Sequence, residues 1–381
     1  MSAAARSLRP LRLAAVLLLT ACACGAPRAL AAELEAARPA AWLDEVTLDG
    51  FLSTAYSYNF NRPDSRSNQL RVFDLDDNSF KLDVFELVLQ RPIAKPREAG
   101  FRVDLELGGS VPRVSSSRGL FRTDSTAEDI DLQQAYLSWI APVGSGLRID
   151  AGKFITHHGY EVIEGYDGWN DNATRSLLFG FAIPFTHTGA RATYGFSRRV
   201  TGMLVLVNGW DVADDNNRSK SVGGQLALTP AASLAITVNA MVGPERADRE
   251  RDPRTLLDGT LVWKAGDRVT LGANADWGRE RGAVAAGEVA RWAGAAGYAR
   301  LTSGDRALSL RAELFDDHDG ARTGTAQRLT EWTLTPEARL APHLLVRADL
   351  RVDHSDHRPF EKRGGATADQ PTVLLDLLYS F

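Results

Sequence analysis

The sequence predicts an all-β chain that crosses a membrane as an antiparallel β-barrel of sixteen strands. Short segments in which apolar and polar residues alternate recur along the chain, separated in turn by long polar intervals and by short turns. This pattern is typical of a membrane barrel, because lipid-facing and lumen-facing residues alternate along each strand. After residue 31, no stretch approaches the roughly eighteen consecutive apolar residues that a transmembrane helix needs.

The start of the chain has the form of a secretory signal peptide. Basic residues precede the apolar run Leu13–Leu19, and the small-residue site Ala29-Leu30-Ala31 follows it. The apolar run is too short to span a bilayer. We therefore predict a signal peptide at residues 1–31, a short periplasmic segment at residues 32–45 and a barrel at residues 46–381.

The signal segment also contains all the cysteines of the chain, Cys22 and Cys24. Leu19-Thr20-Ala21-Cys22 resembles a lipid-attachment box, so lipidation of Cys22 is an alternative to its removal. After cleavage no disulfide and no thiolate metal site is expected. Cleavage removes four arginines and no acid, which leaves 40 of the 44 basic residues against 48 acidic ones, a net charge of −8. This balance argues against nucleic acid as a partner.

Sixteen segments qualify as strands, and an even number is what a single-chain bacterial barrel requires. Within Phe80–Gln90 the alternation changes phase between Val84 and Phe85, which predicts a β-bulge. The segments are Val46–Tyr58, Phe80–Gln90, Phe101–Leu107, Ile130–Ile140, Leu147–Ile155, Gly189–Phe196, Thr201–Trp210, Ser221–Leu228, Leu234–Val242, Thr255–Trp263, Val269–Trp277, Val289–Leu301, Ala307–Phe315, Arg328–Thr335, Leu344–Asp353 and Thr372–Phe381.

The connections between these segments support the strand count. Counted from a periplasmic N-terminus, the odd-numbered connections are long and polar, as in Asn61–Ser79 and Gly108–Asp129, and most even-numbered ones are short turns. Barrels of this class have short periplasmic turns and longer outer loops. The segment His157–His187 is therefore the third outer loop.

A soluble β-sandwich could also produce alternating strands, but it would not need aromatic residues near strand ends. Aromatic girdles at the two membrane interfaces explain such residues. Those near predicted strand ends are Tyr56, Tyr58, Trp139, Trp210, Trp263, Trp277, Trp292 and Tyr379.

The last strand strengthens the assignment to a membrane barrel. Val373, Leu375, Leu377, Tyr379 and Phe381 fall on one face. The strand resembles the C-terminal sorting strand of Gram-negative outer-membrane barrels, which implies that Tyr379 and Phe381 form a signal for the outer-membrane assembly machinery.

The third outer loop is the longest interval without two-residue alternation. Such loops are uncommon and usually carry function. Its many apolar residues would be costly to leave in water. Within a closed barrel the interior available to them is the lumen, so we expect the loop to fold inward and narrow the pore.

The residues around this loop resemble a known family. Gly152-Lys153-Phe154-Ile155-Thr156, Gly159-Tyr160-Glu161, Asn172, Thr174-Arg175-Ser176, Phe181, Pro184, Thr186-His187-Thr188-Gly189 and Arg191 are similar to the OmpL-like β-barrel porins, also called "putative β-barrel porin-2". The resemblance extends over nearly the whole mature chain. It implies an integral outer-membrane porin for small solutes, without naming the solute.

The residues expected at the constriction lie on the loop, and those expected on the lumen wall face inward by alternation. The constriction set is His157, His158, Tyr160, Glu161, Glu164, Asp167, Asp171 and Arg175. The wall set is Arg102, Asp104, Glu106, Arg148, Arg191, Arg311, Glu313, Arg347, Asp349 and Arg351. Four loop acids outnumber one loop arginine, which predicts a weak preference for cations. Pairing of these acids with Arg148 and Arg191 would cancel their field.

Metal binding and catalysis are less favoured. Adjacent His157 and His158 are expected to point apart, so they suggest a polar patch and no metal site. Acidic outer segments beginning at Asp74 and Asp211 lack the glycine and distal glutamate of an EF-hand. Of the seven histidines, only His343 and His354 lie on or next to a strand candidate, and no serine motif accompanies them, so a barrel hydrolase is not favoured.

We therefore expect passive diffusion of small hydrophilic solutes or ions through a water-filled lumen, without a cofactor. The expected partners are outer-membrane lipid, the solutes and the assembly machinery, and a homotrimer is one expected assembly. A non-conducting structural or adhesive barrel is the alternative.

Overall fold

The computed structural model describes residues 44–110 and 130–381. The predicted signal peptide, both cysteines and most of the predicted periplasmic segment lie outside the described residues, as does most of the second outer connection. The chain divides into two units, Met1–Glu45 and Val46–Phe381, and the second contains the strands.

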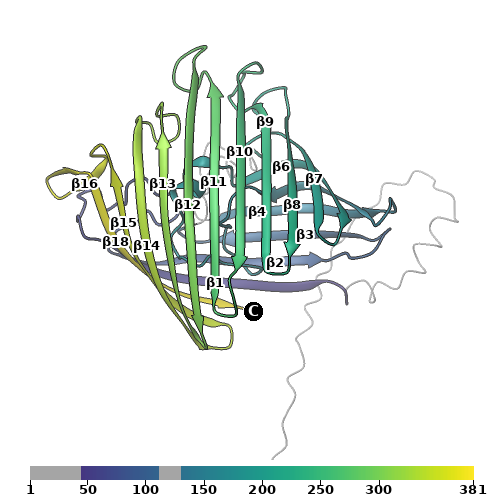
Figure 1. The fold of residues 1–381 in the computed structure, drawn as a ribbon, viewed down its shortest axis with the longest axis horizontal. Helices are drawn as coiled ribbons and strands as arrows, with labels where there is room; N and C mark the ends of the chain where they lie inside the picture. The colour runs from purple at the N-terminus through teal and green to yellow at the C-terminus, as the bar shows by residue number, and fades with distance from the viewer. Residues whose placement is uncertain (1–43, 111–129) are drawn as a thin grey trace, which may run out of the picture. The chain divides into compact units, whose positions relative to one another are not determined.

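Sixteen strands of the second unit form a closed antiparallel barrel, as predicted. Figure 1 shows the later strands, β9 to β15, side by side in sequence order. The barrel strands are β1 (Thr47–Asn59), β2 (Ser79–Arg91), β3 (Ala99–Leu107), β4 (Ile130–Ala141), β5 (Leu147–Ile155), β6 (Thr186–Ser197), β7 (Val200–Val207), β8 (Ser221–Ala231), β9 (Leu234–Pro244), β10 (Pro253–Lys264), β11 (Val269–Arg281), β12 (Val289–Ser303), β13 (Arg306–Asp317), β14 (Gln327–Ala341), β15 (Leu344–Ser355) and β18 (Asp369–Ser380).

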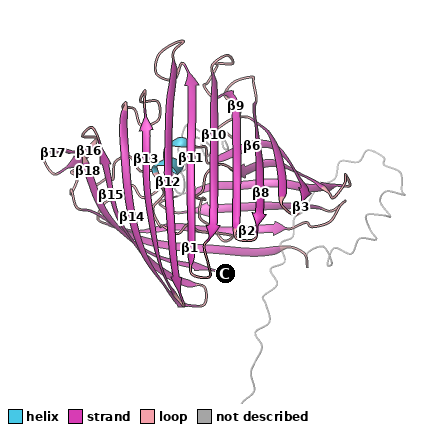
Figure 2. Ribbon diagram, viewed as in Figure 1, coloured by secondary structure: helices cyan, strands magenta, loops and turns pink. Residues whose placement is uncertain are grey.

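The remaining elements are small and lie in connections. β16 (Phe360–Lys362) and β17 (Gly365–Thr367) pair as a hairpin between β15 and β18. A short π-helix, η1 (Leu178–Ala182), packs beside β11 and β12, and it is the helix drawn among the strands in Figure 2. None of the described helices is long and apolar enough to cross a membrane.

Alternation along the strands separates an interior face from an outer one. On β13, Arg311 and Glu313 are buried inside the barrel, whereas Leu310 and Leu314 are exposed on the outer face. The predicted bulge is also present, because the pairing of β1 with β2 shifts at Ser53/Thr54. The phase changes before Val84, which is buried.

The barrel closes through its first and last strands. Gly50 and Phe381 exchange backbone hydrogen bonds, N–H to carbonyl, of 2.9 and 3.0 Å. A Cβ atom at Gly50 would lie only 2.3 Å from the Phe381 ring, so the ring occupies the place of a side chain there. Phe381 and Tyr379 are exposed on the outer face, together with Leu375 and Leu377, as the sequence predicts.

Two aromatic residues assigned to the girdles from sequence do not belong to them. Trp139, Trp263 and Trp277 are exposed on the outer face. Trp210 and Trp292, in contrast, are buried in a cluster inside the barrel with the third outer loop. Proximity to a strand end did not specify which face a side chain occupies.

Candidate functional site

The third outer loop, residues 156–185, crosses the interior of the barrel. Near its start, the Gly159 N–H donates to Asp258 of β10 at 3.1 Å. In its middle, the Tyr166 N–H donates to Glu86 of β2 at 2.6 Å. β2 and β10 are eight places apart in a ring of sixteen strands, which is diametrically opposite. The described loop therefore contacts both sides of the lumen.

Two loop acids form buried ion pairs with the wall. Glu161 lies 2.7 Å from Arg311, and Glu164 lies 2.7 Å from Arg347. Each arginine also holds a wall carboxylate: Arg311 binds Glu331 at 3.0 Å, and Arg347 binds Asp376 at 2.7 Å. Charge-assisted hydrogen bonds of this kind are among the stronger ones in proteins.

The other two loop acids are also paired but reach water. Asp167 lies 2.6 Å from Arg102, and its side chain is 53% exposed. Asp171 lies 3.2 Å from Arg300, and burial raises its pKa against the opposing effect of that arginine. Arg102 and Arg300 again share their charge with wall acids, Asp104 at 2.8 Å and Glu337 at 2.6 Å.

The wall arginines named from sequence as pairing candidates have a different partner. Arg148 and Arg191 both bind Asp150, at 2.8 and 2.9 Å. The partners of the four loop acids come instead from β3, β12, β13 and β15. Arg300 was absent from the predicted wall set, although its position on an alternating strand could have revealed it.

Wall carboxylates also hold the loop backbone. Asp349 accepts the backbone N–H of Thr174 at 2.7 Å. Glu313 accepts that of Leu177 at 2.6 Å. Arg351 donates to the carbonyl of Arg175 and binds Asp353.

Glu106, the remaining acid of the wall set, accepts a hydrogen bond from Gln133 within the wall. Arg175 itself lies 3.5 Å from Glu164.

The apolar half of the loop packs inside the barrel. Leu177, Leu178, Phe179, Ala182, Ile183 and Phe185 are buried with inward side chains of β5, β7 and β12. The Trp292 indole N–H donates to the carbonyl of Ala182 at 3.2 Å. Burial of these side chains, at about 1.5–3 kcal/mol for each large one, stabilises the inward position of the loop.

Tyr160 lies against β11 and β12 at the edge of a cavity of about 250 Å³. Its ring stacks on Tyr298 with centroids 4.0 Å apart. A Cβ atom at Gly272 would lie 2.4 Å from the Tyr160 hydroxyl oxygen, so only glycine leaves room for the ring. Burial raises the pKa of Tyr160 to about 12, and the phenol is neutral at physiological pH.

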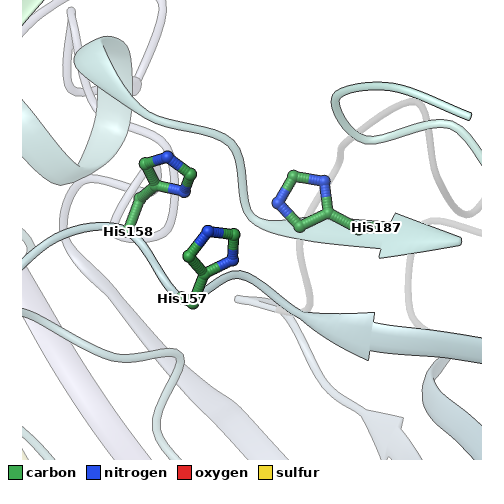
Figure 3. Close-up of side chains that lie close together, drawn as sticks. All are labelled: His157, His158 and His187. Atoms are coloured by element: carbon green, nitrogen blue, oxygen red, sulfur yellow. The ribbon is translucent and has the colours of Figure 1, made fainter. Parts of the chain in front are cut away.

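The expectation that His157 and His158 diverge is wrong. Their ring centroids lie 4.2 Å apart, and the ring of His187 lies 5.9 Å from His157 (Figure 3). His187 is the second residue of β6 and points into the barrel, so the loop ends two residues earlier than predicted from sequence. The segment that follows β5 turns the rings of His157 and His158 toward the ring of His187.

The first outer loop, residues 60–78, also enters the interior, and this position was not predicted from the sequence. Phe73 packs on Phe179 and Phe185 of the third loop. Arg71 forms buried ion pairs with Asp74 and Asp353. The group Leu70, Val72 and Phe73 in an otherwise polar interval was the available signal.

The family profile described as "Putative beta-barrel porin-2, OmpL-like" matches residues 45–381. The fold is similar to the outer-membrane channel DcaP of Acinetobacter baumannii, with a TM-score of 0.60 and 11% identity over 88% of this chain and 97% of that chain. It is similar to an anion-selective porin from Comamonas acidovorans, with a TM-score of 0.59 and 12% identity over 88% and 99%. It is also similar to OmpT of Vibrio cholerae in a trimer form, with a TM-score of 0.56 and 12% identity over 88% and 99%. No curated protein matches the sequence.

Proposed function

Since the chain belongs to the family "Putative beta-barrel porin-2, OmpL-like" and is an outer-membrane porin, not an enzyme, we propose that its third outer loop is the constriction of the diffusion path. The observation that carries this proposal is the attachment of one loop to opposite walls, through Asp258 and Glu86. Small hydrophilic solutes or ions pass where the loop and its ion pairs leave space. The first outer loop adds Phe73 to the same obstruction.

Replacement of Tyr160–Phe181 by a short Gly/Ser linker tests the proposal. The segment contains the paired acids and all of η1 except Ala182, so its removal is expected to raise single-channel conductance in a planar bilayer and the size cutoff for uncharged polymers. Heat-modifiable mobility on a gel establishes that the variant has folded. Unchanged conductance in a folded variant would place the diffusion path away from this loop.

The fixed charges support weak selectivity. Each of the four arginines that holds a loop acid also holds a wall acid, so these groups carry an excess of carboxylates. On the wall formed by β5 and β6, however, Arg148 and Arg191 share the single Asp150. Excess negative and positive groups thus lie in different parts of the interior, and their effects on a passing ion partly offset each other.

We propose that the channel weakly prefers cations, because the most exposed of the paired loop charges is an acid, Asp167. In a KCl gradient, the wild-type reversal potential is expected to show a small preference for potassium. Changing Glu161, Glu164, Asp167 and Asp171 to their amides is expected to move it toward chloride. A wild-type channel that prefers chloride would assign selectivity to Arg148 and Arg191.

The remaining partners are part of the same proposal. The exposed apolar face contacts outer-membrane lipid, and the strand ending at Phe381 is recognised by the assembly machinery. A homotrimer is the proposed assembly, and the solved trimer form of OmpT from Vibrio cholerae has the same fold. Chemical cross-linking in native outer membranes, with detection of a threefold band, tests the trimer. A monomer band alone would contradict it.

A further inference from the structure

Three histidines meet where the third outer loop leaves and rejoins the barrel wall. His157 and His158 follow the end of β5, after Thr156. His187 belongs to β6 and pairs with Phe154 across the β5–β6 ladder. The Thr156 N–H donates to the Phe185 carbonyl at 2.8 Å, which brings the two ends of the loop together.

The three rings present nitrogen atoms to one another. One ring nitrogen from each residue can be chosen so that all three lie within 4.8 Å of one another. Figure 3 shows the rings gathered around one place, with nitrogen atoms turned toward neighbouring rings. A tetrahedral zinc ion with bonds of about 2.0–2.1 Å needs ligand nitrogens roughly 3.3 Å apart. The required adjustment is about 1 Å per ring, within reach of side-chain rotation.

Hydrogen bonds leave the ligand atoms available. His187 Nδ1 lies 3.0 Å from the Gly209 carbonyl and donates to it, which leaves the lone pair on Nε2 facing the cluster. A backbone partner of this kind is what orients a metal-binding imidazole. Thr156 Oγ1 lies 3.2 Å from His187 Nε2 and 3.4 Å from His158 Nδ1.

The other ring nitrogens are buried and have no hydrogen-bond partner among the residues that the structure describes. These are both nitrogens of His157 and Nε2 of His158, whose residue is only 2% exposed. Buried polar atoms normally have a hydrogen-bond or metal partner, because an unsatisfied one is unfavourable. Three such atoms at one place point to a ligand that accepts nitrogen lone pairs.

We propose that His157, His158 and His187 form a binding site for a divalent transition-metal ion of the kind that prefers imidazole, with zinc as the expected occupant. Imidazole ligands suit zinc, copper and nickel, whereas calcium and magnesium prefer oxygen. The charged group nearest to this set on β6 is Arg191, which is paired with Asp150. The bound ion would join the start of the loop to β6 just beyond its end, whether or not that loop controls the pore.

Calorimetric titration with ZnCl2 of the chelator-treated full chain, purified in detergent without a polyhistidine tag, tests the site. One equivalent is expected to bind. His158→Asn and His187→Gln are each expected to weaken binding by more than the roughly 10–100-fold that loss of a supporting group causes. The matched control is the double variant His354→Asn/His357→Asn, whose rings are exposed and lie outside the cluster, and its affinity is expected to equal that of the wild type.

A spectroscopic measurement on the wild type removes dependence on the folding of the variants. Electron paramagnetic resonance of one equivalent of Cu2+ is expected to show hyperfine coupling to several imidazole nitrogens. Absence of stoichiometric zinc binding, a copper spectrum without nitrogen coupling, or equal weakening by the control variant would overturn the proposal. In that case the three rings are a packing cluster.

Discussion

The buried pair between Glu164 and Arg347 provides a sharp test of how the third outer loop is held. The Glu164 carboxylate accepts two bonds from Arg347 Nη2, at 2.8 and 2.7 Å, and one from the Asn170 N–H at 2.9 Å. Both side chains of the pair are almost completely buried. The substitution Glu164→Gln keeps the shape and removes the charge.

The expected effect follows from what Arg347 retains. Removing one partner of a buried ion pair destabilises by about 3–5 kcal/mol. Arg347 keeps Asp376 at 2.7 Å and the Asn170 carbonyl at 2.6 Å, which places the effect near the lower end. A change of about 3 kcal/mol corresponds to roughly a 100-fold shift toward a loop displaced from the wall.

Single-channel recording measures this shift as more time in states of larger conductance. The matched control is Asp167→Asn, the same chemical change in the same loop, at a carboxylate that is 53% exposed and paired with Arg102. Exposed pairs contribute about 0–1 kcal/mol, so the control is expected to divide its time among conductance states as the wild type does, even though its ion preference changes. Equal behaviour of Glu164→Gln and Asp167→Asn would refute the assignment of the buried pair as an anchor.

Four further substitutions, in three tests, probe assembly and packing. Phe381→Asp, or Gly50→Leu at the position that the Phe381 ring covers, is expected to lower the amount of heat-modifiable barrel in the outer membrane. The reason is that an open strand edge cannot persist in lipid. Normal levels of folded barrel in both variants would contradict the role of Phe381 in closing the barrel. Trp292→Ala is expected to destabilise the barrel by about 3–5 kcal/mol, measured as a lower temperature of the gel-mobility transition, and an unchanged temperature would count against its place in the interior cluster. Gly272→Val is expected to displace Tyr160 from Tyr298 and change conductance with little loss of folded protein, whereas an unaltered channel would separate this tyrosine from the diffusion path.

The strands were predictable from sequence because their signal is local. Alternation along a segment such as Ala307–Phe315 specifies one face for lipid and one for the lumen, and the sheet confirms it with Arg311 inward and Leu310 outward. The bulge between β1 and β2 is also a local feature, and it is visible in the sequence as a change in the phase of the alternation near Val84. The inward turn of the third loop followed from its apolar content, which has no favourable place in water.

The contacts inside the lumen were decided by tertiary structure. Glu161 and Arg311, or Asp171 and Arg300, are far apart in sequence and meet only because the ring closes with a particular strand register. The sequence shows how many acids the loop contains but not which arginine each acid contacts. Arg148 and Arg191 were therefore reasonable candidates, although both bind Asp150 instead.

The same limit explains Trp292 and the histidines. A strand end near an interface is equally compatible with an outer girdle and an inner cluster. Because β12 is rich in alanine and glycine, its alternation was too weak to place Trp292 inside. His187 is distant in sequence from His157 and His158, and the backbone pairing that joins the two ends of the loop brings the three rings together. Periodicity along a chain determines which face a side chain occupies, whereas its neighbours across a lumen depend on the closed three-dimensional ring.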